Sequence, residues 1–272
     1  MFHFIYKQIS RLFYGTGVSK VPGVRKIHLK ITENTKPETI DVFGYKMFLD
    51  EKDDACHSIT TDDETEEMKI LKKIIKKGDC VIDIGANIGF YTLFFTNLVG
   101  KTGKVIAFEP EPENFSILKK NIETNSLENV TLFQKAVGSR NELIKMKLTS
   151  SGGFHHINDT GDLEVDCIRL DDYVKNANFV KMDAEGYEIE ILKGMPNLLQ
   201  QDITIMSEYY FKLIRKYNKP IEFFNILSDV GFKFIDMRRK FCETNITDIT
   251  KNYDKTSGAT DILCVKDDFT KL

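Results

Sequence analysis

The middle of the chain alternates short apolar runs with longer helix-like segments, and this rhythm constrains the fold more than any other feature. Residues 80–84, 104–108 and 130–136 are predicted strands, and residues 89–99 and 113–125 are the predicted helices between them. The first strand is apolar apart from Asp83, which is typical of a strand buried on both faces. Strands and helices that alternate in this way form a mostly parallel sheet with helices on both faces. We therefore predict an α/β fold.

Further strands and helices are predicted before and after this region. Further predicted strands are residues 40–43, 45–49, 144–148, 164–168, 179–183, 203–207, 232–237 and 261–265. Further predicted helices are residues 62–77, capped by Thr61 or Asp62 and ended by Gly78, then 189–199 and 220–230. The strands at 144–148 and 164–168 alternate polar with apolar residues, so we expect them to form a β-hairpin insertion outside the main sheet.

Length and charge limit the possible organisation and partners. The 272 residues fit one large domain with appendages, and we expect an N-terminal appendage over 1–60 and a main domain over 61–272 with an insertion at about 141–170. The formal charge of −3 gives no basic surface for nucleic acid. The sequence does not indicate the oligomeric state.

The five cysteines form no C-x-x-C pair and have no histidine at a metal-ligand spacing, so we expect reduced thiols in a cytoplasmic protein. Residues 1–14 are apolar but contain Lys7 and Arg11, and they are too short to span a bilayer. We expect this segment to form a helix that packs on the body of the protein. The alternative is a helix at a membrane surface.

A glycine-rich loop follows the first strand and contains Gly85, Ala86, Asn87 and Gly89. Its spacing is G-x-x-x-G, unlike the G-x-G-x-x-G that cradles a pyrophosphate. Asp83 precedes it and would repel a pyrophosphate, but it suits the cationic amino group of an amino-acid ligand. The loop therefore favours S-adenosylmethionine over NAD.

Glu109 ends the next strand, 26 positions after Asp83. An acidic side chain at this place can accept hydrogen bonds from both ribose hydroxyls of a nucleoside. Pro110 and Pro112 stiffen the turn that presents it. The alternative is an ordinary strand-to-helix turn with surface carboxylates.

These segments resemble the FkbM-type methyltransferases. The matching stretches are residues 81–92, 103–110, 136–138, 170–173 and 181–188, the last of which contains Asp183-Ala184-Glu185-Gly186. The resemblance implies a class I methyltransferase Rossmann-like fold, with a seven-stranded sheet whose last strand is antiparallel. It also implies O-methylation of a hydroxyl group on a sugar, glycan or natural product, and it adds Ala136 and Asp183 to the cofactor-binding residues. It covers neither the first 60 residues nor those from Tyr209 onward.

Four further side chains are candidates for the chemistry. Asp183 ends the fourth parallel strand, where it could accept the proton of the acceptor hydroxyl or bind a divalent cation, for which the sequence offers no other support. Glu185 follows it, and Glu208 ends the next strand. His155, in a glycine-rich loop with His156, is a candidate general base. Family members often carry a histidine two positions after Glu208, whereas this chain has Tyr210 there.

Two other functions stay open on the sequence alone. A nicotinamide-dependent oxidoreductase or epimerase would share the architecture, but no pyrophosphate loop or Tyr-x-x-x-Lys pair is evident. A non-catalytic nucleotide-binding protein would also share it, although the acids at positions 83, 109 and 183 argue against lost activity. The methyl acceptor cannot be identified from the sequence.

Overall fold

The computed structural model describes residues 37–50, 65–149, 155–158, 160–210, 214, 220–239, 241–253 and 259–266. The predicted N-terminal helix over residues 1–14 lies outside these ranges, as does the expected division at residue 60. Both stay predictions. Within the described ranges, no helix has the length and apolar character needed to cross a bilayer.

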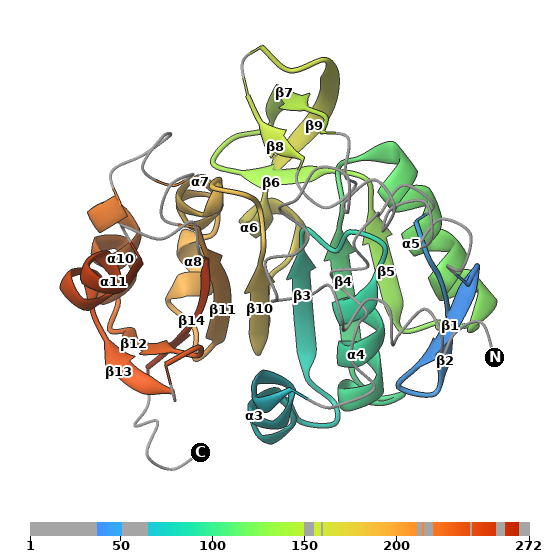
Figure 1. Ribbon diagram of the computed structural model, residues 1–272, viewed down its shortest axis with the longest axis horizontal. Helices are drawn as coiled ribbons and strands as arrows, with labels where there is room; N and C mark the ends of the chain where they lie inside the picture. The colour runs from blue at the N-terminus through green and yellow to red at the C-terminus, as the bar shows by residue number, and fades with distance from the viewer. Residues whose placement is uncertain are drawn as a thin grey trace, which may run out of the picture.

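An eight-stranded sheet forms the centre of the molecule, in the order β13-β12-β14-β11-β10-β3-β4-β5 (Figure 1). Its strands are β3 (Cys80–Ile84), β4 (Lys104–Phe108), β5 (Val130–Phe133), β10 (Phe179–Met182), β11 (Thr204–Tyr209), β12 (Lys233–Asp236), β13 (Cys242–Thr244) and β14 (Thr260–Val265). The five strands from β11 to β5 are parallel. β14 is antiparallel to both of its neighbours. The predicted Rossmann-like sheet with an antiparallel last strand is confirmed, and β13 adds an eighth strand at one edge.

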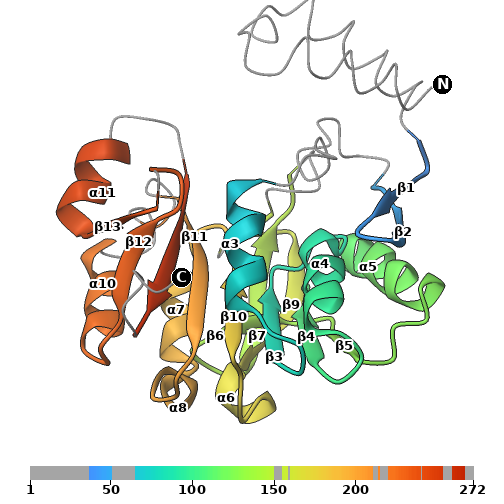
Figure 2. The ribbon, with the colours of Figure 1, turned by 90° about the horizontal axis from the view of Figure 1, so that it is seen from below.

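Helices cover both faces of this sheet (Figure 2). One face carries α3 (Glu66–Ile74), α4 (Phe90–Val99) and α5 (Pro112–Thr124). The other carries α6 (Leu170–Tyr173), α7 (Glu188–Lys193), α8 (Pro196–Leu199) and α10 (Pro220–Ser228). Alternate residues of a strand point to opposite faces, so Val81 packs with the residues of α3 and α4, whereas Ile82 packs with those of α7, α8 and α10. Asp83 therefore faces α3 and α4.

A smaller four-stranded sheet stands above the carboxyl ends of the parallel strands (Figure 1). It contains β6 (Ala136–Gly138), β9 (Leu163–Arg169), β7 (Glu142–Lys147) and β8 (His156–Ile157), in that order. The predicted antiparallel pair is confirmed as β7 and β9. The predicted strand over 130–136 is wrong at its end, because β5 stops at Phe133 and Ala136 begins β6. The change of sheet brings Gly138 against α7, where a Cβ on Gly194 would be 1.9 Å from the Gly138 carbonyl oxygen.

The remaining elements differ from the predictions mainly at their ends. β1 (Thr39–Val42) and β2 (Tyr45–Phe48) form the predicted hairpin around Gly44. The helix predicted over 62–77 begins later, at Glu66, because the Thr65 hydroxyl accepts a hydrogen bond from the Met68 amide and caps α3. The predicted helix over 189–199 is two helices, since α7 ends at Lys193 and Pro196 begins α8. The polar segment that joins β12 to β14 contains β13 and α11 (Ile246–Tyr253), which the sequence pattern did not indicate.

Candidate functional site

A cavity lies at the carboxyl ends of β3, β4 and β10, below the smaller sheet. β3 and β10 are the neighbouring strands at which the chain changes direction across the sheet, and ligands of α/β proteins bind at this switch point. Met146 and Ile157 bring the smaller sheet into the cavity wall. The predicted site residues that line the cavity are Gly85, Asn87, Glu109, Pro110, Ala136, His155, Asp183 and Glu185.

The glycine loop, residues 85–89, fits tightly against its surroundings. Gly85 has a φ of +76°, and a Cβ there would be 1.9 Å from the carbonyl oxygen of Asp183. Gly89 has a φ of +100° and precedes α4, and its Cβ would be 2.7 Å from Leu118 Cδ1. Both positions need glycine for the backbone conformation and for the close approach. Ala86 is buried between them.

Asp83 lies beneath this loop rather than at the cavity surface. Its side chain is fully buried, and Oδ2 accepts a hydrogen bond from the Thr92 hydroxyl at 2.6 Å. Oδ1 has no hydrogen-bond partner among the described residues. Burial raises the pKa of the Asp83 carboxyl group, although Lys181 and Thr92 oppose the shift. The predicted contact between Asp83 and a cofactor stays a prediction, and Oδ1 is the atom through which it would form.

Glu109 is held by backbone amides at the cavity wall. Its Oε2 accepts from the Asn87 amide at 2.8 Å, and its Oε1 accepts from the Glu111 amide at 3.0 Å. Burial raises the pKa of Glu109 to about 7, against the effect of these two hydrogen bonds. Asn87 has a φ of +50°, an uncommon conformation that aims its amide at the carboxylate. The glycine loop and β4 are thereby joined through one side chain.

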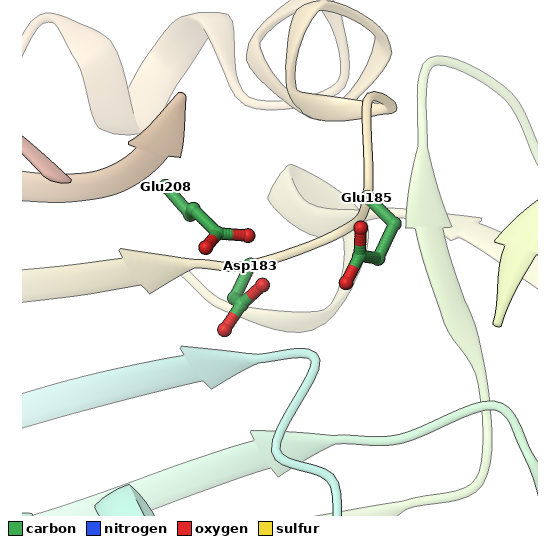
Figure 3. Close-up of side chains that lie close together, drawn as sticks. All are labelled: Asp183, Glu185 and Glu208. Atoms are coloured by element: carbon green, nitrogen blue, oxygen red, sulfur yellow. The ribbon is translucent and has the colours of Figure 1, made fainter. Parts of the chain in front are cut away.

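Three carboxylates form an acidic cluster of Asp183, Glu185 and Glu208 (Figure 3). One oxygen from each lies within 4.8 Å of the others. Burial, followed by the charge of Asp183, raises the pKa of Glu185 to about 8 and that of Glu208 to about 10. Carboxyl groups packed this closely share protons or a cation. The structure therefore brings together the three acids that the sequence placed at the ends of β10 and β11.

The turn that carries Glu185 is itself unusual. Glu185 has a φ of +50°, a conformation that non-glycine residues adopt rarely. The buried Glu188 carboxylate fixes the turn, because its Oε1 accepts hydrogen bonds from the amides of Ala184 and Gly186. Strained backbone of this kind is concentrated at functional sites.

Lys181 also belongs to this region, and the prediction of site residues missed it. Its ammonium nitrogen is 3.0 Å from Asp183 Oδ2, and its side chain is buried. Burial alone would lower the pKa of Lys181, but Asp183 and Asp83 together raise it above its ordinary value. A lysine two positions before Asp183 in an otherwise apolar strand shares a face with that aspartate, and this signal was present in the sequence.

His155 lies on the Glu109 side of the cavity. Its Nδ1 accepts a hydrogen bond from the Thr149 amide at 3.1 Å, so a neutral ring carries its proton on Nε2. Burial lowers the pKa of His155, while nearby Glu111 and Asp50 act in the opposite direction. The ring therefore presents a hydrogen-bond donor, which does not fit the predicted role as a general base. His156 belongs to β8 and pairs with Lys147 of β7.

Comparisons with known proteins find methyltransferases. The family model described as the methyltransferase FkbM domain matches residues 83–244, more than half of the chain. Hexuronic acid methyltransferase AglP of Haloferax volcanii is 27% identical over 204 residues, which cover 72% of this chain and 84% of that protein. A probable cobalt-precorrin-6B C(15)-methyltransferase of Saccharolobus solfataricus is 29% identical over 159 residues, covering 50% of this chain and 77% of that protein.

Solved structures resemble the chain at lower identity. Methyltransferase FkbM from Methylobacillus flagellatus KT has a TM-score of 0.48 and 14% identity, over 89% of this chain and 59% of that chain. An S-adenosylmethionine-dependent O-methyltransferase from Thermotoga maritima has a TM-score of 0.44 and 12% identity, over 87% of this chain and 81% of that chain.

Proposed function

Because this chain belongs to the family of methyltransferase FkbM domains, we propose that it transfers the methyl group of S-adenosylmethionine to an oxygen atom of a sugar or glycan. The observation that carries the proposal is the position of the acidic cluster. Asp183 and Glu185 of this cluster line one end of a cavity whose other end, at β4 two strands away, holds Glu109, a group suited to a nucleoside ribose. The hexuronic acid methyltransferase supports a sugar as the acceptor.

The cofactor would lie along the cavity from Glu109 to Asp183. Each Glu109 oxygen already accepts one amide and keeps a lone pair for a ribose hydroxyl. The backbone of the glycine loop, from Gly85 through Ala86 and Asn87 to Gly89, would pass close to the amino-acid part of the cofactor. Pro110 and Ala136 would border the adenine. The sulfonium and ammonium groups are cationic, so carboxylates at this end favour their binding.

Methyl transfer to a hydroxyl is an in-line displacement. The hydroxyl oxygen forms a bond to the methyl carbon, the carbon–sulfur bond breaks, and its electron pair remains on sulfur in S-adenosylhomocysteine. The hydroxyl proton must go to a base, and we assign that role to Asp183 at the end of β10. Glu185 and Glu208 would hydrogen-bond to the acceptor. A divalent cation among the three carboxylates would be an alternative way to lower the pKa of the hydroxyl group.

His155 takes a different role in this proposal from the one the sequence suggested. Its Nδ1 is occupied by the Thr149 amide, and its neighbours Glu111 and Asn114 flank Glu109 rather than the acidic cluster. We assign its Nε2–H as a donor to the nucleoside part of the cofactor.

Binding and transfer are tested separately. A thermal-shift series with S-adenosylmethionine, S-adenosylhomocysteine and NAD tests the cofactor, and stabilisation by NAD alone would refute the assignment. A transfer assay with labelled cofactor against neutral sugars, hexuronic acids and glycan extracts tests the acceptor, and each reaction is repeated with EDTA. Loss of transfer in EDTA that magnesium restores would favour the cation over a purely proteinaceous base.

A further inference from the structure

A buried lysine lies at the centre of the main sheet, directly below the acidic cluster. Lys181 is 5% exposed, although it belongs to a parallel strand flanked by β3 and β11. An ammonium group in such a place loses its hydration, and a buried ion pair is weak evidence for a contribution to stability. The position of Lys181 therefore needs another explanation.

The groups around Lys181 come from several elements on this face of the sheet. They are Asp83 on β3, Glu67 on α3, Tyr91 on α4, Glu208 on β11, Asp261 on β14 and Asp183 at the end of β10. Lys181 lies 4.8 Å from the centroid of the Tyr91 ring, so this ring covers the ammonium group from the helix side. Among these carboxylates, the direct ion pair within the described residues is with Asp183 Oδ2 at 3.0 Å.

Asp83 also lies near Lys181, but it does not form a direct ion pair with it. It stands opposite Lys181 in the register of β3 and β10, but its Oδ2 is bonded to Thr92. Lys181 therefore fixes Oδ2 of Asp183, whose carboxylate also contacts Glu208 and lines the cavity. A charge-assisted hydrogen bond of this kind is shorter and stronger than one between neutral groups, so it orients the carboxylate.

We propose that Lys181 is a positioning residue for methyl transfer: its ammonium group orients the Asp183 carboxylate toward the acceptor oxygen. The inference rests on the proposed function. Without the ammonium group, the Asp183 carboxylate would lose the contact that fixes Oδ2, and it would be free to turn away from the acceptor toward Glu208 beside it. Lys181 itself gains and loses no proton in the cycle.

The first test separates turnover from binding. We expect Lys181→Met to lower kcat by about 10- to 100-fold, within the range of general acid–base effects, while the KM for S-adenosylmethionine stays within about threefold. Lys181→Arg, which keeps the charge, should restore part of kcat. Lys119→Met is the matched control, because it removes an exposed lysine from a helical ion pair with Glu123 and should leave kcat unchanged.

A double-mutant cycle tests whether Lys181 acts through Asp183. In the Asp183→Asn background, Lys181→Met should lower kcat by no more than about twofold, since coupled residues are non-additive. A full further loss in that background would overturn the proposal, as would a normal kcat for Lys181→Met alone. If Lys181→Met does not fold, the pair Asp83→Asn and Lys181→Met removes a buried carboxylate together with the ammonium group and should show the same loss of kcat.

A second measurement needs no acceptor, and so it separates this inference from the proposed function. Crystal structures of the wild type and of Lys181→Met report the orientation of the Asp183 carboxylate. We expect the wild type to keep the contact between Lys181 Nζ and Asp183 Oδ2, and we expect the carboxylate to rotate away from this direction in Lys181→Met. An unchanged orientation in the variant would overturn the role of Lys181 whether or not methyl transfer is found.

Discussion

The two ends of the cavity are built in opposite ways. At one end, both oxygens of Glu109 are bonded to backbone amides, so this carboxylate is oriented without any ligand. At the other end, Asp183, Glu185 and Glu208 crowd together, with Lys181 as the cation in direct contact. A carboxylate whose orientation is fixed by backbone amides suits a ligand that always presents the same groups. A cluster with excess negative charge suits a cation or a proton released by the substrate. The comparison therefore assigns recognition of the nucleoside to the first end and methyl transfer to the second.

The largest effect should come from Asp183→Asn, which removes the proposed base at the acidic end of the cavity. The amide keeps the shape of the side chain and can still accept from Lys181, but it cannot take the acceptor proton. We expect kcat to fall by roughly 10²- to 10⁴-fold. The affinity for S-adenosylhomocysteine, which lacks the positive sulfonium group, should fall much less than kcat, and calorimetry measures it. A comparable loss of affinity would mean that the two ends are not separate.

Gly85→Ala should damage both ends at once, because the glycine loop touches each of them. The new Cβ would collide with the Asp183 carbonyl oxygen, and the residue would keep a positive φ. Overpacking and backbone strain together should lower the unfolding free energy by about 3 kcal/mol, measured by urea denaturation. Gly44→Ala is the matched control, since Gly44 also has a positive φ but a Cβ there meets no atom within 4 Å. Equal losses in the two variants would show that strain, and not the contact with β10, explains the effect.

The two ends also differ in how far the sequence predicted them. The glycine loop and Glu109 follow one another within a single strand-helix-strand unit, so local order along the chain was enough to place them together. The acidic cluster needed β10 and β11 to be neighbours, which the resemblance implied. Lys181 was missed although the strand pattern places it on the same face as Asp183. Its other neighbours come from several strands and from helices α3 and α4, and the sheet register is needed to show that they meet.

His155 and the strand ends illustrate a different limit. Whether His155 offers an acceptor or a donor depends on its hydrogen bond to Thr149, and residue types alone do not specify that contact. The end of β5 and the start of β6 depend on packing against α7, which is distant in sequence. Element types could be predicted from periodicity, whereas these details depend on tertiary contacts.

The pH dependence of stability in Glu109→Gln tests the role of Glu109 at the other end of the cavity. The pKa of Glu109 is raised to about 7 in the fold, above its ordinary 4.5, so the folded state favours the protonated form. This contribution to stability is complete below pH 4.5 and is lost as the pH rises through 7. Glutamine presents an NH2 group to one of the two backbone amides at every pH, so the informative quantity is the change with pH. We expect the unfolding free energy of the free Glu109→Gln variant, relative to the wild type, to rise by about 1–2 kcal/mol between pH 5 and pH 8, because the wild-type carboxyl group loses its contribution in this range.

The same substitution should weaken the cofactor. Gln retains one acceptor oxygen for two ribose hydroxyls, so the affinity for S-adenosylhomocysteine at pH 8 should fall by about 10-fold. Thermal unfolding and calorimetry at the two pH values measure both effects. The expected pH-dependent difference in stability without weaker binding would show that Glu109 does not contact the cofactor.

The smallest effect should come from Thr92→Val, which tests whether Asp83 supports the site from below. Valine keeps the shape of threonine but leaves Asp83 Oδ2 without its donor inside the sheet. An unsatisfied buried acceptor costs about 1–3 kcal/mol, and we expect a decrease of about 1 kcal/mol in the unfolding free energy because the carboxyl group can take up a proton instead. Thr96→Val is the matched control, since it removes a buried hydroxyl of the same helix that donates only to a backbone carbonyl. An equal decrease in the two variants would mean that Thr92 has no special contact with Asp83. A larger decrease at pH 9 than at pH 6 in Thr92→Val alone would show that the charged form of Asp83 depends on this hydroxyl.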